Sequence, residues 1–266
     1  MTAIITSAPG KCILFGEHAV VYGHPAVAVA IDQRISIKIQ PSASGMWLLD
    51  GGKLNMKRNP HIKGLIEKLW PVDQGAPPLS IHIEGNIPRS SGLGSSAALS
   101  VALAAALRGA RGRWVTHAET VGQNRWAEGF GSGITASDAY GKSGGFFSTI
   151  EQDKMFLLTG EESIDTDENA ILAHSVEAAA QNGRASPIDS STCSHGGVIV
   201  ISNQVQNDLT HLYKRSLKMP DSERFWHIHE LELGIVPDDI YLVIGNTGVN
   251  APTGKQVAKV AQMLEL

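Results

Sequence analysis

The chain has 266 residues, of which 42% are hydrophobic and 18% are charged, and its formal net charge is −4. This length suffices for one large domain or two modest ones with a proper core. The weak negative charge argues against a protein that binds nucleic acid or an acidic membrane surface. The sequence shows no secretory signal, no CxxC pair and no apolar run of about 18 residues, so we expect a cytoplasmic protein.

The first part of the chain is predicted to be rich in strands. Residues 3–32 contain short apolar runs broken by glycine and proline, which favours short strands separated by turns. Apolar and polar residues alternate in "ISIKIQPSA" (35–43) and again in "LSIHIEGNI" (79–87), as they do in half-buried strands. Between these two segments, "PHIKGLIEKLW" (60–70) has apolar residues at helical spacing and predicts a helix.

The second part of the chain alternates between helices and strands. The small residues of 95–107 and the segment "DTDENAILAHSVEAAA" (165–180) predict two helices, the second with an acidic first turn. "GGVIVIS" (196–202) and "DDIYLVIGNTGV" (238–249) predict two further strands, and residues 253–266 predict a last helix. Strands and helices that alternate without regular βαβ repeats indicate an α+β fold.

Two segments interrupt this pattern and are interpreted as insertions, about 111–160 and 203–236. The second is polar and ends in the amphipathic stretch "ERFWHIHELEL" (223–233). Its histidines His227 and His229 are predicted to be solvated. The histidines of the chain are scattered without an HExxH pattern, so no zinc site is expected.

A stretch rich in glycine and serine, "IPRSSGLGSSAALS" from Ile87 to Ser100, runs directly into the predicted helix. The first N–H groups of a helix are free and carry partial positive charge, and glycines before them let the backbone wrap closely around an anion. The hydroxyls of Ser95 and Ser96 can bond a phosphate or ligate Mg²⁺. The stretch is neither a Walker A loop nor a GxGxxG turn. From its residues alone it is either a phosphate cradle or a loop that caps a packed helix.

Three segments in this order resemble the GHMP kinases, and within them the mevalonate kinases of the archaeal type. They are "APGKCILFGEHAVVYG" (8–23), "PRSSGLGSSAALS" (88–100) and "GRASPIDSSTCSHGG" (183–197). The stretch "YLVIGNTGVNAPTGKQVAKV" (241–260) also resembles a strand, turn and helix of that family. The resemblance covers most of residues 1–110, 165–200 and 239–266.

The resemblance implies a two-domain α+β fold with the active site in the cleft between the domains. The N-terminal domain, of the ribosomal protein S5 domain 2-like type, is expected over residues 1–200. The ferredoxin-like C-terminal domain is expected to begin in 201–266 and to be only partly present, as if truncated. The third Gly-rich motif of the family, near KLTGAGGGG, has no match here, and the Gly-rich segment 129–145 does not stand in for it.

The resemblance also implies a function. The expected reaction is the ATP- and Mg²⁺-dependent transfer of a phosphoryl group to the primary hydroxyl of mevalonate, giving 5-phosphomevalonate in isoprenoid biosynthesis. The expected partner is this small molecule rather than a nucleic acid or a membrane, and a homodimer is one expected assembly. Two alternatives stay open: a related kinase for another alcohol, such as phosphomevalonate or homoserine, and a non-catalytic nucleotide-binding homologue.

Two residues are expected to carry the chemistry. By resemblance, Asp189 in "ASPID" is the catalytic base, although an aspartate after a proline is also common in a structural turn. Lys11 follows Pro9 and Gly10, and its ammonium can stabilise the forming alkoxide and lower the pKa of a neighbouring group. Asp138, in "TASDAYGKSGG", also precedes a glycine pair, but no SPxD pattern precedes it, and it is interpreted as a loop residue.

The remaining candidates bind ligands. Mg²⁺ is expected on Ser96 and Glu177, although a glutamate on a helix is often simply exposed. The substrate is expected to contact Lys11, Glu17, His18, Asp189 and Thr247, although a lone histidine is often a core residue and a threonine in a turn is usually structural. ATP is expected on a loop made of Pro88, Ser90, Ser91, Gly92, Leu93, Gly94, Ser95, Ser96 and Ala97.

Overall fold

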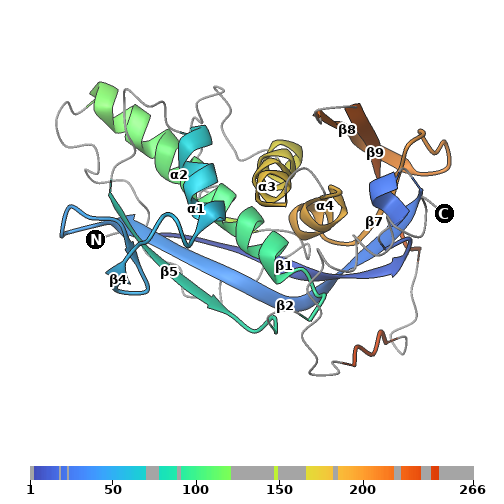
Figure 1. Ribbon diagram of the computed structural model, residues 1–266, viewed down its shortest axis with the longest axis horizontal. Helices are drawn as coiled ribbons and strands as arrows, with labels where there is room; N and C mark the ends of the chain where they lie inside the picture. The colour runs from blue at the N-terminus through green and yellow to red at the C-terminus, as the bar shows by residue number, and fades with distance from the viewer. Residues whose placement is uncertain are drawn as a thin grey trace.

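The computed structural model describes residues 3–17, 19–22, 24–69, 78–88, 91–120, 147–148, 166–181, 185–218, 223–234 and 241–245. Helices and strands alternate along these residues, so the α+β class is confirmed (Figure 1). In chain order the elements are β1 (Ile4–Phe15), the 3-10 helix η1 (Ala19–Tyr22), β2 (Ala26–Pro41), β3 (Leu48–Leu49), β4 (Gly52–Lys53), α1 (Pro60–Leu69), β5 (Leu79–Gly85), α2 (Ser95–Thr120), β6 (Phe147–Ser148), α3 (Thr166–Ala180), α4 (Ile188–His195), β7 (Val198–Ser202), β8 (Thr210–Lys218) and β9 (Glu223–Glu230).

The described strands form one sheet around the long strand β2. The 9-stranded sheet has the order β4-β3-β5-β2-β7-β9-β8, and β1 pairs with β2 and β6 off this path. One stretch of β2, 26–29, pairs with β7, and another, 35–41, pairs with β5. The pairing is antiparallel except between β3 and β5. Because β2 joins both halves of the sheet, it fixes β7 relative to β1 and β5.

The helices α1 to α4 cover one face of the sheet (Figure 1). The predicted helix from Ser95 is confirmed and extends to Thr120. Its side chains from 100 to 110 are all buried, and most of them are alanine or other small residues, which let α2 approach β1 and β2 closely. Polar contacts join α2 to two neighbouring helices. His61 of α1 lies 3.0 Å from the Ser100 hydroxyl, and Arg108 donates a hydrogen bond to Glu168 of α3.

The first strand is longer than the sequence predicts. The run of short strands expected in residues 3–32 is wrong, because β1 continues through Pro9 and Gly10 to Phe15. The register against β2 shifts between Pro9 and Lys11, which marks a β-bulge. A proline has no N–H to donate, and a bulge is one of the places where a strand tolerates it. The bulge lies directly beside Lys11.

The segment interpreted as a polar insertion at 203–236 contains two strands of the sheet. β8 and β9 pair with each other, and β9 pairs with β7. Trp226 and Ile228 are buried against the helices, and His229 is fully buried, so the prediction that it is solvated is wrong. The sequence does not predict β9, because its apolar positions alternate with histidines rather than with clearly exposed residues. The domain boundary predicted at residue 200 falls inside β7, and the division into domains stays a prediction.

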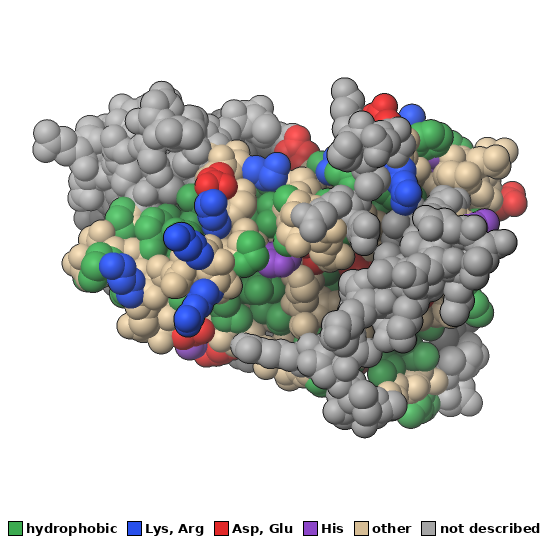
Figure 2. Space-filling view, in the orientation of Figure 1, with side chains coloured by type: hydrophobic (Ala, Val, Ile, Leu, Met, Phe, Trp, Pro, Cys, Tyr) green, Lys and Arg blue, Asp and Glu red, His purple; other side chains and the backbone are tan. Residues whose placement is uncertain are grey.

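The strand predicted at 238–249 is not formed in the part of it that is described. Residues 241–245 have no regular structure, and Tyr241 and Val243 are 79% and 88% exposed. On the face of the molecule in Figure 2, Lys and Arg side chains are interspersed with Asp and Glu side chains and with apolar and uncharged ones. No described helix combines the length and the apolar character that a membrane span requires.

Candidate active site

The loop before α2 is held against β1. Gly92 and Gly94 have φ angles of +79° and +72°, a conformation that glycine adopts without strain. The Leu93 carbonyl accepts a 3.0 Å hydrogen bond from the backbone N–H of Lys11. The Ser91 hydroxyl donates to the Pro88 carbonyl at 2.7 Å. These contacts fix the loop so that the free N–H groups of α2 begin next to the Lys11 side chain.

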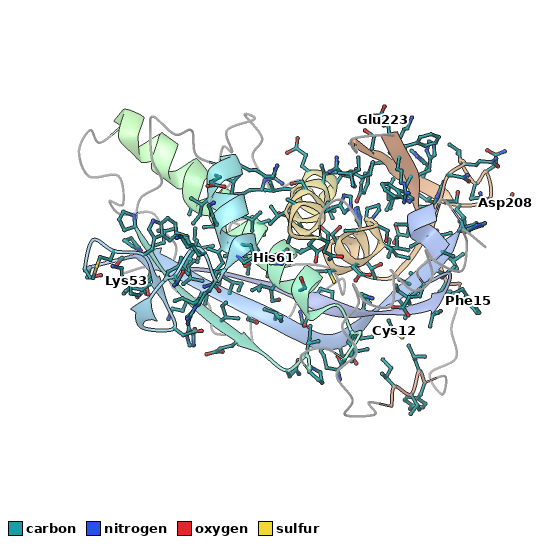
Figure 3. All side chains as sticks on the ribbon, viewed as in Figure 1. Cys12, Phe15, Lys53, His61, Asp208 and Glu223 are labelled. Atoms are coloured by element: carbon teal, nitrogen blue, oxygen red, sulfur yellow. The ribbon has the colours of Figure 1, made fainter. Side chains whose placement is uncertain are left out.

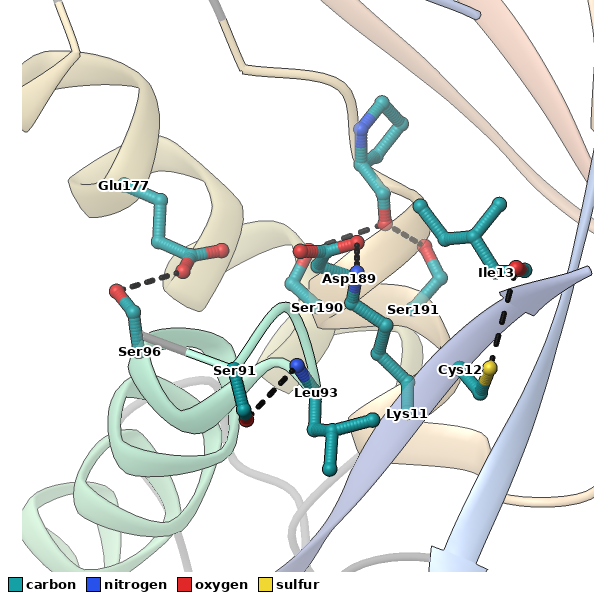
Figure 4. Close-up of polar contacts among 11 residues, drawn as sticks. Lys11, Cys12, Ile13, Ser91, Leu93, Ser96, Glu177, Asp189, Ser190 and Ser191 are labelled. Carbon is teal, nitrogen blue, oxygen red and sulfur yellow. Dashed lines mark hydrogen bonds and ion pairs between the residues drawn. The ribbon is translucent and has the colours of Figure 1, made fainter. Parts of the chain in front are cut away.

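Lys11, within β1, and Asp189, in the first turn of α4, form an ion pair (Figure 4). The Lys11 Nζ atom lies 3.0 Å from Asp189 Oδ1, and the side chains are 4% and 34% exposed. Lys11 is therefore buried behind a carboxylate that still reaches solvent. The two residues that the sequence predicts as catalytic are thus brought into direct contact from segments far apart in the sequence.

Asp189 is positioned by the first turn of α4. Pro187 precedes the helix, and its carbonyl accepts hydrogen bonds from the hydroxyls of Ser190 and Ser191 at 3.2 and 2.6 Å (Figure 4). The Ser191 N–H donates to the same carbonyl at 2.8 Å. An aspartate in the first turn is favoured by the partial positive charge of the helix N-terminus.

The electrostatics of the site keep Lys11 charged. Burial of the ammonium works against its charged form, but the charge and hydrogen bond of Asp189, helped by the charge of Glu17, outweigh burial. The pKa of Lys11 is therefore raised above its ordinary value of 10.5. A permanently protonated amine suits charge stabilisation rather than proton abstraction.

The second predicted pair, Ser96 and Glu177, is also brought together. The Ser96 hydroxyl, in the first turn of α2, donates to Glu177 Oε1 of α3 at 3.2 Å (Figure 4). The sequence left open whether Glu177 is an exposed helix residue, and the side chain is buried. Burial, helped by the negative charge of Asp189, raises the pKa of Glu177 to about 8 against the opposing effects of Ser96 and Lys11.

This pair fits a divalent cation such as Mg²⁺. The raised pKa means that Lys11 and the Ser96 hydrogen bond do not outweigh burial and the charge of Asp189 at the Glu177 carboxylate, and a bound cation would supply further positive charge. Mg²⁺ is usually held by one or two carboxylates together with phosphate and water oxygens. Among the described residues no group of three or more His, Cys, Asp or Glu side chains could hold a metal. One carboxylate and one hydroxyl at a helix N-terminus match a cation that takes its other ligands from a nucleotide.

Several predicted residues stay untested. Glu17 is exposed beyond the end of β1, and its negative charge contributes to the raised pKa of Lys11. His18, Ser90 and Thr247 lie outside the described residues, as does Asp138. Their expected roles remain predictions.

The structure adds Cys193, which the sequence analysis did not single out. Its side chain is fully buried on α4, one helical turn after Asp189. Burial, with the charges of Asp189 and Glu177, raises the pKa of the Cys193 thiol well above its ordinary value. The thiol is therefore neutral and serves as apolar packing in the core. Its i, i+4 spacing from Asp189 places both residues on one helix face only once α4 is known, and the sequence predicts no helix over 188–195.

Comparisons with known proteins confirm the resemblance to the GHMP kinases. The sequence profile described as GHMP kinases N terminal domain matches residues 60–141. The chain is 46% identical over 110 residues to a mevalonate kinase of Methanothermobacter thermautotrophicus, covering 40% of this chain and 36% of that protein. It is 43% identical over 106 residues to one of Archaeoglobus fulgidus, covering 39% of this chain and 37% of that protein. The chain thus spans little more than a third of these relatives.

Two solved structures share the fold. A protein from Listeria innocua aligns over 99% of this chain and 66% of its own, with a TM-score of 0.57 and 18% identity. The structure of L. major mevalonate kinase in complex with R-mevalonate aligns over 97% of this chain and 60% of its own, with a TM-score of 0.50 and 23% identity.

Proposed function

We propose that this relative of the GHMP kinases transfers the γ-phosphoryl group of ATP to the primary hydroxyl of mevalonate, giving 5-phosphomevalonate and ADP. The observation that carries the proposal is the Lys11–Asp189 ion pair, which lies beside the glycine loop and N-terminus of α2. Phosphoryl transfer to an alcohol requires positioning and charge stabilisation more than covalent chemistry. The buried Lys11 ammonium, the partly exposed Asp189 carboxylate and the backbone N–H groups at the start of α2 are suited to those functions.

Asp189 is proposed to orient the hydroxyl and accept its proton. One oxygen of its carboxylate is engaged by Lys11, and the side chain is 34% exposed, which leaves it accessible to an alcohol. Lys11 is proposed to stabilise the negative charge that develops on the attacking oxygen. The backbone N–H groups at the start of α2 are proposed to bind the phosphates of ATP.

Ser96 and Glu177 are proposed to hold Mg²⁺ on the nucleotide. When bound, the ion would neutralise charge on the transferred phosphoryl group. Glu177 would then give up the proton that it retains in the metal-free protein, since its pKa is raised to about 8. The Ser96 hydroxyl, which now donates to Glu177, would turn its oxygen toward the ion.

The choice of mevalonate rests on the relatives named mevalonate kinase. Glu17, His18 and Thr247 are proposed to contact this substrate. We also propose action in isoprenoid biosynthesis, as a homodimer and in the cytoplasm. The cytoplasmic setting is supported by the two cysteines of the chain, Cys12 and Cys193, which are both free.

The test is a coupled ADP-release assay with mevalonate, phosphomevalonate and homoserine, with the product identified by mass spectrometry. We expect Mg²⁺-dependent turnover with mevalonate. The Asp189→Asn variant should lose about 10²–10⁴-fold in turnover, whereas Asp138→Asn should lose little. Nucleotide binding without turnover of any alcohol would instead support a non-catalytic homologue. An active Asp189→Asn beside an inactive Asp138→Asn would overturn the assignment of the base.

A further inference from the structure

We propose that His174 and Arg215 are positioning residues that fix the segment leading into α4 and so hold Asp189 against Lys11. The inference rests on the proposed function, because it assigns the Asp189 carboxylate a catalytic role. It concerns residues that lie outside the reacting groups: His174 is on α3, and Arg215 is on β8.

The hydrogen bonds of His174 define its protonation state. Arg215 Nε lies 2.9 Å from His174 Nδ1, and His174 Nε2 lies 3.1 Å from the Ala185 carbonyl oxygen. A guanidinium has only donors, so Nδ1 must accept and cannot carry a proton. The single ring proton is therefore on Nε2 and is donated to Ala185. Arg215 thus sets the tautomer that lets His174 hold the backbone at Ala185.

The imidazole is suited to a permanent contact. His174 is fully buried. Burial is the main cause that lowers its pKa to about 4, and the charge of Arg215 adds to the effect. The ring is consequently neutral at physiological pH, and both hydrogen bonds persist there.

The hydrogen bond from His174 to Ala185 matters because Ala185 lies just before α4. Ala185 lies two residues before Pro187, whose carbonyl anchors the first turn of α4, and four residues before Asp189. His174 itself lies one helical turn before Glu177 on α3. One buried ring therefore ties the helix that carries the proposed metal ligand to the segment that carries the proposed base.

A second contact from the same strand reaches α4. Tyr213, two residues before Arg215 on β8, places its hydroxyl 2.8 Å from the Ser191 hydroxyl. The ring of Trp226 on β9 meets the ring of His174 edge to face, with centroids 6.1 Å apart. The β8–β9 pair therefore contacts α3 through His174 and α4 through Ser191.

The experiment compares His174→Phe, His174→Gln and Arg215→Met with wild type. Phenylalanine keeps the ring volume without either hydrogen bond, whereas glutamine can still donate to Ala185. His61→Phe is the matched control, since His61 lies on α1 and bonds Ser100 instead (Figure 3). Two quantities are measured: the kinetic constants with mevalonate and MgATP, and amide hydrogen exchange in residues 188–192.

We expect His174→Phe and Arg215→Met to lower kcat by about 10- to 100-fold, with KM for MgATP changed less than about 3-fold. Exchange in 188–192 should accelerate in both, and His174→Gln should recover most of each property. If His174→Phe matches His61→Phe in kcat and exchange, or if glutamine recovers nothing, the proposal is overturned. Should His174→Phe not fold, Arg215→Met decides alone.

The two proposals fail differently. A wild-type chain that phosphorylates no alcohol would refute the proposed function, and the exchange measurement would still decide whether His174 holds α4. Unchanged exchange in an active His174→Phe variant would refute the positioning role and leave the proposed function standing.

Discussion

Replacing Glu177 with glutamine should separate its effect on stability from its proposed role as a metal ligand. In the metal-free protein the buried carboxyl keeps its proton until the pH approaches about 8, compared with an ordinary value of 4.5. Between these values the native state binds a proton that the unfolded state has already lost. The unfolding free energy therefore falls as pH rises through this window. Glutamine resembles the protonated carboxyl and cannot ionise, so the variant should lack this slope.

The magnitude follows from the shift. Each unit of pKa difference corresponds to about 1.4 kcal/mol. Most of the effect lies between pH 5 and pH 9, where wild type should lose about 4 kcal/mol relative to Glu177→Gln. The variant should thus be markedly more stable than wild type at pH 9 and similar to it at pH 5. The group is buried, so solvent screening does not reduce this figure greatly.

The assay is denaturant unfolding without metal at several pH values, with Glu67→Gln as the control. Glu67 is 62% exposed on α1 and serves as the solvent-exposed counterpart of Glu177. The Glu177→Gln variant should also lose most of its Mg²⁺-dependent turnover, because a neutral amide is a weak ligand for the ion. Parallel pH curves for wild type and Glu177→Gln would refute the argument that this carboxyl is buried and uncompensated.

The other predictions concern the loop and Lys11. Ser96→Ala should raise the Mg²⁺ concentration needed for half-maximal turnover severalfold with little change in Tm, since alanine suits a helix; an unchanged Mg²⁺ requirement would remove Ser96 from the metal site. Lys11→Met should lower kcat more than it raises KM, whereas a raised KM with unchanged kcat would make Lys11 a binding residue only. Gly94→Ala should lower kcat at least 10-fold more than Gly92→Ala, measured side by side; equal losses would mean that backbone strain alone is responsible.

Features governed by local rules could be predicted from the sequence. The helix from Ser95 follows from small residues after a glycine-rich turn, and α1 and α3 follow from apolar spacing and an acidic first turn. The meeting of Ser96 with Glu177 could not be derived in this way, since 81 residues separate them. That pair, like Lys11 with Asp189, was predicted from resemblance alone.

Features that depend on neighbouring strands were mispredicted. Pro9 reads locally as a break, yet the pairing of β1 with β2 on both sides of it carries the strand through a bulge. The β9 segment reads as amphipathic, yet its register against β7 and β8 decides that His229 is buried. The positioning role of His174 was equally hidden, because it depends on Arg215 and Ala185, which only the folded chain brings to the same ring.

The contrast between Gly92 and Gly94 follows from what surrounds each one. Both have positive φ angles, so alanine is strained at either position. A Cβ atom at Gly92 would meet nothing within 4 Å, whereas one at Gly94 would lie 2.8 Å from Lys11 Cγ. Alanine at Gly94 must therefore displace the Lys11 side chain, whose Nζ atom lies only 3.0 Å from Asp189. Because the ion pair depends on that distance, the difference between the two variants isolates the contribution of the Lys11 position to turnover.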